Sequence, residues 1–334
     1  MTASPGISPV PSRSPRSIED FRGDFDELAQ LMQRSWAENH AQPLLYTPEF
    51  LHSHFSLPGA SFRLAPAIYD NSRLAGFVAG FPRRVRYRGE ELPILLISFL
   101  TVANEYKRSG YGLVLREELL KRARAAGFAG TLSFCIEGDA MHGILARYNE
   151  RNGLPASRIL SIRYMRRLIL AKPKASNAES VDDAWLEGFL AAAARASETL
   201  PFARVWTRED ADWQCRQRAG AVVANHSSGG RHGFLAGYVM PIADGARTKC
   251  LLIDDILWND LNLEERLALL EKLVNRAAGL GVRMAVVPLL GYADTEPFSR
   301  ARFLPSPRVV HVYFRWLRGT VPPDPVSSLY IDVF

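Results

Sequence analysis

The chain has 334 residues, of which 47% are hydrophobic and 23% charged, a balance typical of an ordinary globular protein. This composition excludes a largely disordered or membrane-embedded chain, and the length predicts two domains that each bury a core of their own. The net charge of +6 suits a polyanionic cofactor, a nucleic acid or a membrane surface, so charge alone does not choose among them.

The N-terminal segment 1–16 carries several Ser and Pro residues and no apolar stretch like that of a signal peptide. We therefore expect a flexible tail and a cytoplasmic protein. The richest apolar stretch, Leu92–Ala103, is interrupted by Pro93 and Ser98. It is shorter than the roughly 20 residues of a membrane-spanning helix, so we expect no membrane span.

Two further partner classes are not expected. The three cysteines have no CxxC or Cys/His spacing of a metal site, and we interpret them as core thiols: Cys135, Cys215 and Cys250. The basic pairs Arg83-Arg84 and Arg166-Arg167 flank strand-like segments without interleaved stacking aromatics. They are interpreted as solvated strand ends, so no nucleic acid is expected; affinity that falls as salt rises would show the opposite.

The first half of the chain alternates helical and strand patterns. Helical spacing covers Ile18–Glu38 and then Pro48–Phe55. The strands Phe62–Tyr69, Leu74–Tyr87 and Leu92–Val102 follow, separated by turns at Asp70-Asn71 and Arg88-Gly89. The remaining elements are a helix at Leu113–Ala126 ended by Gly127, a strand at Thr131–Ile136, a helix at Asp139–Arg151 and a strand at Ile159–Leu170.

The second half repeats this order after a linker at Ala171–Asn177 and an alanine-rich helix at Val181–Ser197. Strands are expected at Phe202–Trp206, Ala221–His226, Gly233–Ile242 and Cys250–Leu257, then a helix at Leu263–Gly281, strands at Met284–Leu290 and Val309–Leu317, and a short helix between these two. The sequence thus predicts an α/β protein with a mixed sheet and two tandem copies of one fold. The divisions are a tail at 1–16, a first domain at 17–170, a linker and helix at 171–200 and a second domain at 201–334.

The junction between the third strand and the third helix carries a phosphate-binding pattern. Phe99-Leu100-Thr101-Val102 runs through Lys107-Arg108-Ser109-Gly110-Tyr111-Gly112 directly into a helix. Backbone N–H groups at a helix start point toward one place with the helix dipole behind them, which suits a phosphate. Glycine at 110 and 112 permits close backbone approach and positive φ. A dinucleotide fingerprint and a nucleotide P-loop are both excluded, because the third glycine and the Gly-Lys-Ser/Thr run are missing.

The segment Thr101–Leu113 resembles the signature of GNAT acyltransferases, in which a hydrophobic strand and a charged turn precede R/Q-x-x-G-x-G/A and a helix. Lys107 takes the usual Arg/Gln place. The resemblance extends to the order of elements over residues 18–170. It implies an acyl-CoA-dependent N-acyltransferase, most simply an N-acetyltransferase, that uses acetyl-CoA or another acyl-CoA as co-substrate. Its acceptor would be a small-molecule or protein amine, and the oligomeric state is not predicted.

The resemblance also implies roles for this sequence. The third strand splays from its neighbour after a bulge, the backbone near Leu100 and Val102 pairs with pantetheine, and an N–H near Thr101 or Val102 polarises the acyl carbonyl. The diphosphate lies on the amides of Arg108 to Leu113. The cofactor-binding set is therefore Leu100, Thr101, Val102, Lys107, Arg108, Ser109, Gly110, Tyr111, Gly112 and Leu113, together with Asn149.

The acid and the base are less fixed. GNAT proteins often place a tyrosine four residues before the glycine that closes the next helix, but here Asn149 takes that position and Tyr148 precedes it. Tyr148 is the candidate acid if the helix end is irregular; otherwise it is a packed aromatic. Glu137 and His142 are the candidate bases, with a solvated carboxylate or a hydrogen-bonded helix histidine as the alternatives.

The second copy lacks the glycine pair. Its corresponding loop, Trp258-Asn259-Asp260-Leu261-Asn262, places Asp260 where it would repel a diphosphate, so the second copy is not expected to bind the cofactor. Asn262 and Glu265 have capping-box spacing there. If both copies had lost their chemistry, the protein would instead be an acyl-CoA-binding or scaffold protein.

Overall fold

The computed structural model describes residues 17–36, 44–138, 156–170, 180–242, 248–318 and 323–333. The first half contains β1 (Ile18–Asp20), α1 (Phe25–Trp36), α2 (Pro48–Phe55), β2 (Pro66–Asp70), β3 (Arg73–Tyr87), β4 (Glu90–Val102), α3 (Tyr111–Ala125), β5 (Gly130–Ile136) and β6 (Ala156–Leu168). The second contains α5 (Asp183–Glu198), β7 (Phe202–Arg204), α6 (Arg208–Asp212), β8 (Ala221–Ser228), β9 (Arg231–Ile242), β10 (Thr248–Leu257), α7 (Leu263–Gly279), β11 (Val282–Leu289), α8 (Glu296–Arg300) and β12 (Leu304–Trp316).

The two halves repeat one topology, as the sequence predicts. In the first, β2, β3 and β4 form an antiparallel meander, and β5 returns parallel to β4 after α3. In the second, β8, β9 and β10 form the same meander, and β11 returns parallel to β10 after α7. A parallel return requires a crossover, which each helix supplies. The helix predicted at Val181–Ser197 is present as α5.

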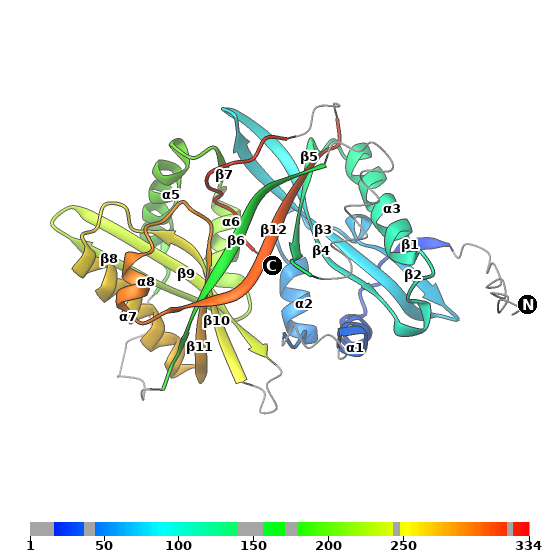
Figure 1. Ribbon diagram of the computed structural model, residues 1–334, viewed down its shortest axis with the longest axis horizontal. Coiled ribbons are helices and arrows are strands. Elements are labelled where there is room, and N and C mark those ends of the chain that lie inside the picture. Colours follow the sequence, from blue (N-terminus) through cyan, green and yellow to red (C-terminus); the bar gives the residue numbers. More distant parts are fainter. Residues whose placement is uncertain are drawn as a thin grey trace, which may run out of the picture.

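The strands of both halves join in one sheet with the order β1-β2-β3-β4-β5-β12-β6-β11-β10-β9-β8, and β7 pairs with β3 (Figure 1). The last strand of each half crosses to the other. Strand β6 pairs with β11 and β12, whereas β12 lies between β5 and β6. A fragment ending at Leu170 would therefore leave β6 without either of its sheet neighbours, so the two copies depend on each other for their central strands.

Two expected elements differ in the structure. The helix predicted over Ile18–Glu38 is wrong at its start, because Ile18–Asp20 pairs with β2 and α1 begins only at Phe25. Gly23 has φ +84°, which interrupts a helix. The strand predicted over Phe62–Tyr69 begins as a 3₁₀ turn, since the Ser61 hydroxyl accepts a hydrogen bond from Arg63 N. The predicted linker 171–177 and helix 139–151 lie outside the described residues.

Helices α3 and α7 cover the same face of the sheet. The apolar face of α3 that the sequence predicts packs on Val78 and Leu95, while α7 packs on Ala285 and Val287. Side chains alternate between faces along each strand, and the register across β5, β12, β6 and β11 places these two sets on one side. Helices α1 and α2 lie on the opposite face, against the cluster that includes Phe77.

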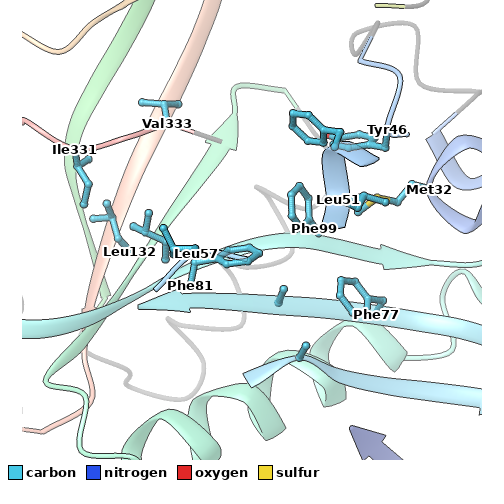
Figure 2. Packing of buried hydrophobic residues seen from close by; sticks show 14 of the residues in the cluster. Met32, Tyr46, Leu51, Leu57, Phe77, Phe81, Phe99, Leu132, Ile331 and Val333 are labelled. Carbon is cyan, nitrogen blue, oxygen red and sulfur yellow. The ribbon is translucent and has the colours of Figure 1, made fainter. Parts of the chain in front are cut away.

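The C-terminal segment 323–333 lies between the halves. Tyr330 exchanges backbone hydrogen bonds with β7, donating to Phe202 O and accepting from Arg204 N. Leu329 N donates to Leu290 O, just after β11. Figure 2 shows Ile331 and Val333 beside the core that surrounds Leu132 and Phe81. This segment thus fills the junction of the two copies with both backbone and side-chain contacts.

A buried ion network holds the same segment in place. It consists of three arginines and three aspartates, each at most 3% exposed: Arg83, Arg204, Arg218, Asp254, Asp255 and Asp332. Arg83 Nε donates to Asp332 Oδ1 at 2.9 Å, and Arg204 Nη1 lies 3.4 Å from the same oxygen. Burial raises the pKa of Asp332, but the guanidinium groups of Arg83 and Arg204 outweigh it and hold that pKa well below its usual range. Asp332 is therefore ionised in the folded protein.

The other two aspartates complete the charge balance. Arg218 Nη1 donates to Asp254 Oδ2 at 3.1 Å, and Gln214 Nε2 bridges Asp254 and Asp255 at 3.2 and 3.1 Å. Burial and the neighbouring Asp254 raise the pKa of Asp255 to about 7. The Tyr330 hydroxyl also donates to Asp255 Oδ1 at 3.0 Å, so the network contacts the C-terminal segment beyond Asp332 itself.

We predict that Asp332→Asn lowers the free energy of unfolding by about 3–5 kcal/mol, because two buried guanidinium groups, those of Arg83 and Arg204, lose the carboxylate that they share. Asp324→Asn is the matched control, since Asp324 lies in the same segment and pairs with Arg88 while both side chains are more than half exposed. That change should stay within about 1 kcal/mol. Urea unfolding followed by far-UV circular dichroism measures both, and equal losses in the two variants would contradict the role of the network.

Candidate functional site

The end of β4 is open on the side of β5. The parallel pairing of β4 with β5 covers Ile94 to Ile97 and stops at the pair Ile97–Ser133, although β4 continues to Val102. Past that point, β3 is the strand that pairs with β4 among the residues whose positions are described. The splay that the family resemblance implies is therefore present, and it exposes backbone groups of β4 to a ligand.

A bulge precedes this open stretch. Ser98 pairs with Ala79 and Thr101 with Phe77, so Phe99 and Leu100 together oppose one residue of β3. Phe99 has φ +60°, an uncommon conformation for an aromatic residue. Its ring points into the core, with its centroid 5.7 Å from that of Tyr46 (Figure 2). Packing of the ring thus supports a strained backbone at the position where β4 and β5 separate.

The direction of the backbone N–H groups follows from one hydrogen bond. Ala103 N donates to Ala75 O of β3 at 2.9 Å. Because these groups alternate along a strand, Thr101 N–H also faces β3, whereas Val102 N–H faces the open edge. Of the two residues expected near the acyl carbonyl, Val102 is the one whose N–H faces the gap.

The loop after β4 presents further N–H groups at the start of α3. Gly110 is the N-cap residue with φ +87°, and a Cβ there would meet open space, so glycine is required by conformation alone. Leu113 and Val114 donate to Gly110 O, and Tyr111 N donates to Ser109 Oγ at 3.4 Å. Within the described part of the chain, no acceptor is recorded for the N–H groups of Arg108, Gly110 and Gly112. These three remain available to an anion.

The expectation of a positive φ at Gly112 is wrong. Gly112 lies in the first turn of α3, and the left-handed residues of this loop are Arg108, at φ +68°, and Gly110. Lys107 and Arg108 are exposed, and their role as counter-charges stays a prediction. The Tyr106 ring stacks on Tyr111 at 5.4 Å. The Tyr106 hydroxyl donates to Asp70, which fixes the loop against β2.

In the second half, the place that corresponds to the open end of β4 and the start of α3 is occupied by groups of the protein itself. Strand β10 also carries a bulge at Asp254 and separates from β11 after Leu252. There, Asp254 Oδ1 accepts a hydrogen bond from Val333 N at 3.3 Å. At the start of α7, Asn262 and Glu265 form a reciprocal capping box. In it, the side chain of each residue accepts a hydrogen bond from the backbone N–H of the other. This geometry supports the expectation that the second copy does not hold the cofactor.

Of the predicted acid and base residues, Glu137 has a described position. Tyr148, His142 and Asn149 lie outside the described residues, and their roles stay predictions. Glu137 follows β5, and its N–H donates to Val309 O at 3.0 Å. Its Oε1 lies 3.6 Å from Nε2 of His311 on β12. The sequence reading missed His311, although a single histidine in the apolar run Val309-Val310-His311-Val312 was a detectable signal.

The cysteines are thiols without disulfide partners. Burial raises the pKa of Cys250 to about 12, and that of Cys215 also rises well above its usual value through burial and the charge of Asp255. Both therefore stay protonated and unreactive. Across the residues with described positions, no group of three metal-binding side chains occurs, and no helix is long and apolar enough to cross a membrane.

Comparisons with known proteins agree with this geometry. Residues 25–150 match the profile described as the acetyltransferase (GNAT) family. The match spans less than half of the chain, and the matched segment is similar to that family. It contains the bulged β4, the glycine loop and α3, the features on which the resemblance depends.

Solved structures resemble the whole chain. Two structures of N-myristoyltransferase from Saccharomyces cerevisiae with bound myristoyl-CoA align with TM-scores of 0.74 and 0.72 at 14% identity. Each alignment covers 96% of this chain and 87% or 82% of the yeast protein. With the repeated topology, this shows a mixed α/β sheet built from two tandem GNAT-like folds.

A curated relative is the glycylpeptide N-tetradecanoyltransferase of Dictyostelium discoideum, 24% identical over 103 residues. The match covers 30% of this chain and spans about a quarter of the length of that relative.

We predict one coenzyme A site per chain, measured by isothermal titration calorimetry. Gly110→Glu combined with Gly112→Glu should abolish binding, because it places carboxylates against the N–H groups at the start of α3. Gly89→Glu is the control: Gly89 also has positive φ, at +82°, and open space around it, but it lies in the turn between β3 and β4. Two equivalent sites, or binding that survives the double change, would refute the assignment.

Proposed function

We propose that this protein is an acyl-CoA-dependent N-acyltransferase that moves an acyl group from coenzyme A to a primary amine by direct attack. The observation that carries the proposal is the combination, within the segment that matches the GNAT family, of an open β4 edge and N–H groups at the start of α3 for which no acceptor is recorded among the described residues. A ligand that suits both must have a chain that hydrogen-bonds like a strand and an anionic group at its end. The pantetheine arm and diphosphate of an acyl-CoA meet both requirements.

In this proposal the backbone does most of the binding. Pantetheine pairs with the open edge at Leu100 and Val102, and the diphosphate lies on the amides from Arg108 to Leu113 with Lys107 as counter-charge. Val102 N–H, with Leu100 N–H from the bulge, polarises the thioester carbonyl as negative charge develops on its oxygen. The amine attacks in its neutral form, so a base must first remove a proton.

The acyl chain and the acceptor are inferred from the relatives. The printed names of the yeast and Dictyostelium proteins refer to myristoyl or tetradecanoyl transfer, and the latter to glycylpeptides. We therefore propose a long-chain acyl-CoA and the N-terminal amine of a peptide in preference to acetyl-CoA and a small amine. Cytoplasmic location remains part of the proposal.

A non-catalytic acyl-CoA-binding protein is the second candidate function. The observation in its favour is Asn149, which stands where the family often has a tyrosine. Binding without turnover, for every acyl-CoA and amine tested, would favour this alternative.

We predict that myristoyl-CoA with a peptide that begins with glycine gives a higher kcat/KM than acetyl-CoA with the same peptide. Release of free thiol across a series of acyl chain lengths measures this. An acetylated glycine peptide lacks the attacking amine and is the control, so its rate should equal that of hydrolysis alone. Turnover confined to acetyl-CoA would leave the transferase reaction in place but contradict the proposed acyl length.

We predict that Tyr148→Phe lowers kcat by roughly 10²–10⁴-fold with little change in acyl-CoA affinity, the effect of losing a general acid. Asn149→Ala is the comparison. If Asn149 faces the thioester instead, Tyr148→Phe is nearly silent and Asn149→Ala weakens acyl-CoA binding. Full activity in both variants would mean that solvent or substrate supplies the proton.

A further inference from the structure

A polar cluster crosses the three central strands beside the open edge of β4. His311 Nδ1 of β12 lies 2.9 Å from Ser161 Oγ of β6, and His311 Nε2 lies 3.6 Å from Glu137 Oε1 after β5. The His311 side chain is 5% exposed, whereas that of Glu137 is 61% exposed. The cluster therefore links a buried imidazole to a carboxylate in contact with solvent.

The cluster lies on the face of the sheet that carries α3. Arg315 of β12 has Nη1 3.7 Å from Oε1 of Glu117 on α3. His311 precedes Arg315 by four residues on the same strand, so the two side chains share a face. Val310 and Val312, the two neighbours of His311 along the strand, belong to the core on the opposite face. The imidazole is thus on the same side as the helix that begins at the proposed diphosphate site.

The cluster is also close to the proposed thioester position along the sheet. The β4–β5 pairing ends at Ser133, and Cys135, two residues later on the same face, pairs directly with His311. Neighbouring strands are about 4.8 Å apart, so His311 stands one strand away from the gap between β4 and β5.

We propose that His311 is the base of the acyl transfer, with Ser161 and Glu137 as its positioning residues; this inference rests on the proposed function. Nδ1–H donates to Ser161 Oγ, which leaves Nε2 as the proton acceptor. The ammonium of the acceptor gives one proton to Nε2, directly or through one water. The freed lone pair forms the C–N bond as the C–S bond breaks, the thiolate of coenzyme A leaves, and the new amide nitrogen releases its second extra proton to solvent. Glu137 stabilises the resulting imidazolium and passes its proton to solvent.

Several charged groups act on this imidazole. Among the described residues, the following ionisable groups lie on the same side of the sheet as the imidazole: Cys135 and Glu137 at the end of β5, Tyr313 and Arg315 of β12, Arg158 and Arg163 of β6, and Glu117 of α3. The arginines disfavour the imidazolium and the two glutamates favour it. Removal of the Glu137 charge therefore disfavours the imidazolium of His311, and the acid limb of the rate profile should move to lower pH.

The test compares kcat/KM against pH in the full-length protein, with myristoyl-CoA and a glycine-initiated peptide as probes. We expect the wild type to lose activity at low pH, as His311 becomes protonated. Glu137→Gln should move that limb to lower pH, and His311→Gln should remove it and lower kcat/KM by roughly 10²-fold or more. The matched control is His232→Gln, because His232 Nδ1 lies 2.9 Å from Ser227 Oγ in an exposed pair on β8 and β9. This control should keep the wild-type profile.

Calorimetry with coenzyme A shows whether each variant is folded, since none of these side chains belongs to the proposed binding loop. Turnover with an unchanged pH profile in His311→Gln would overturn this inference while leaving the transferase proposal intact. An acyl adduct on Ser161, detected by intact mass after incubation without peptide, would also overturn it, because Ser161 would then be a nucleophile. No turnover by the wild type with any acyl-CoA would refute both proposals.

Discussion

Three buried arginines and three buried aspartates hold the C-terminal segment at the junction of the two copies, and the central architecture depends on them. Removal of six charges from water is costly, and only close pairing compensates for it. Here Asp332 pairs with Arg83 of β3 and with Arg204 of β7, so one carboxylate joins the first half, the second half and the C-terminal segment. Hydrophobic contacts through Ile331 and Val333 add to this, but they do not fix a register as the ion pairs do.

The same constraint makes the two copies unequal. Each half bulges and separates from its parallel neighbour at corresponding strands, β4 and β10. In the second half, Asp254 at the bulge is committed to Arg218 and to Val333 N, and the start of α7 is closed by its own capping box. In the first half, no such partners of the corresponding N–H groups are found among the described residues. In the second copy, groups of the protein therefore occupy the place that is open in the first copy.

The exchange of β6 and β12 links the open site to the second half. Strand β12 comes from residues 304–316, yet it pairs with β5, which borders the gap in the first half. His311 arrives beside Glu137 by this route. The strand exchange thus brings a residue of the second copy next to the open site of the first.

The sequence by itself determined the repeated order of elements, the apolar face of α3 and the glycine loop, because periodicity, turn residues and a short motif are local properties of the chain. Local patterns misplaced the start of α1, where Gly23 and pairing with β2 override the helical spacing. Tertiary structure alone decided which strands neighbour each other, the bulge at Phe99 and the placement of Asp332, since each depends on residues more than a hundred positions apart or on core packing. The cluster of Ser161, His311 and Glu137 is of this kind, because its three strands meet only after the two halves exchange their last strands.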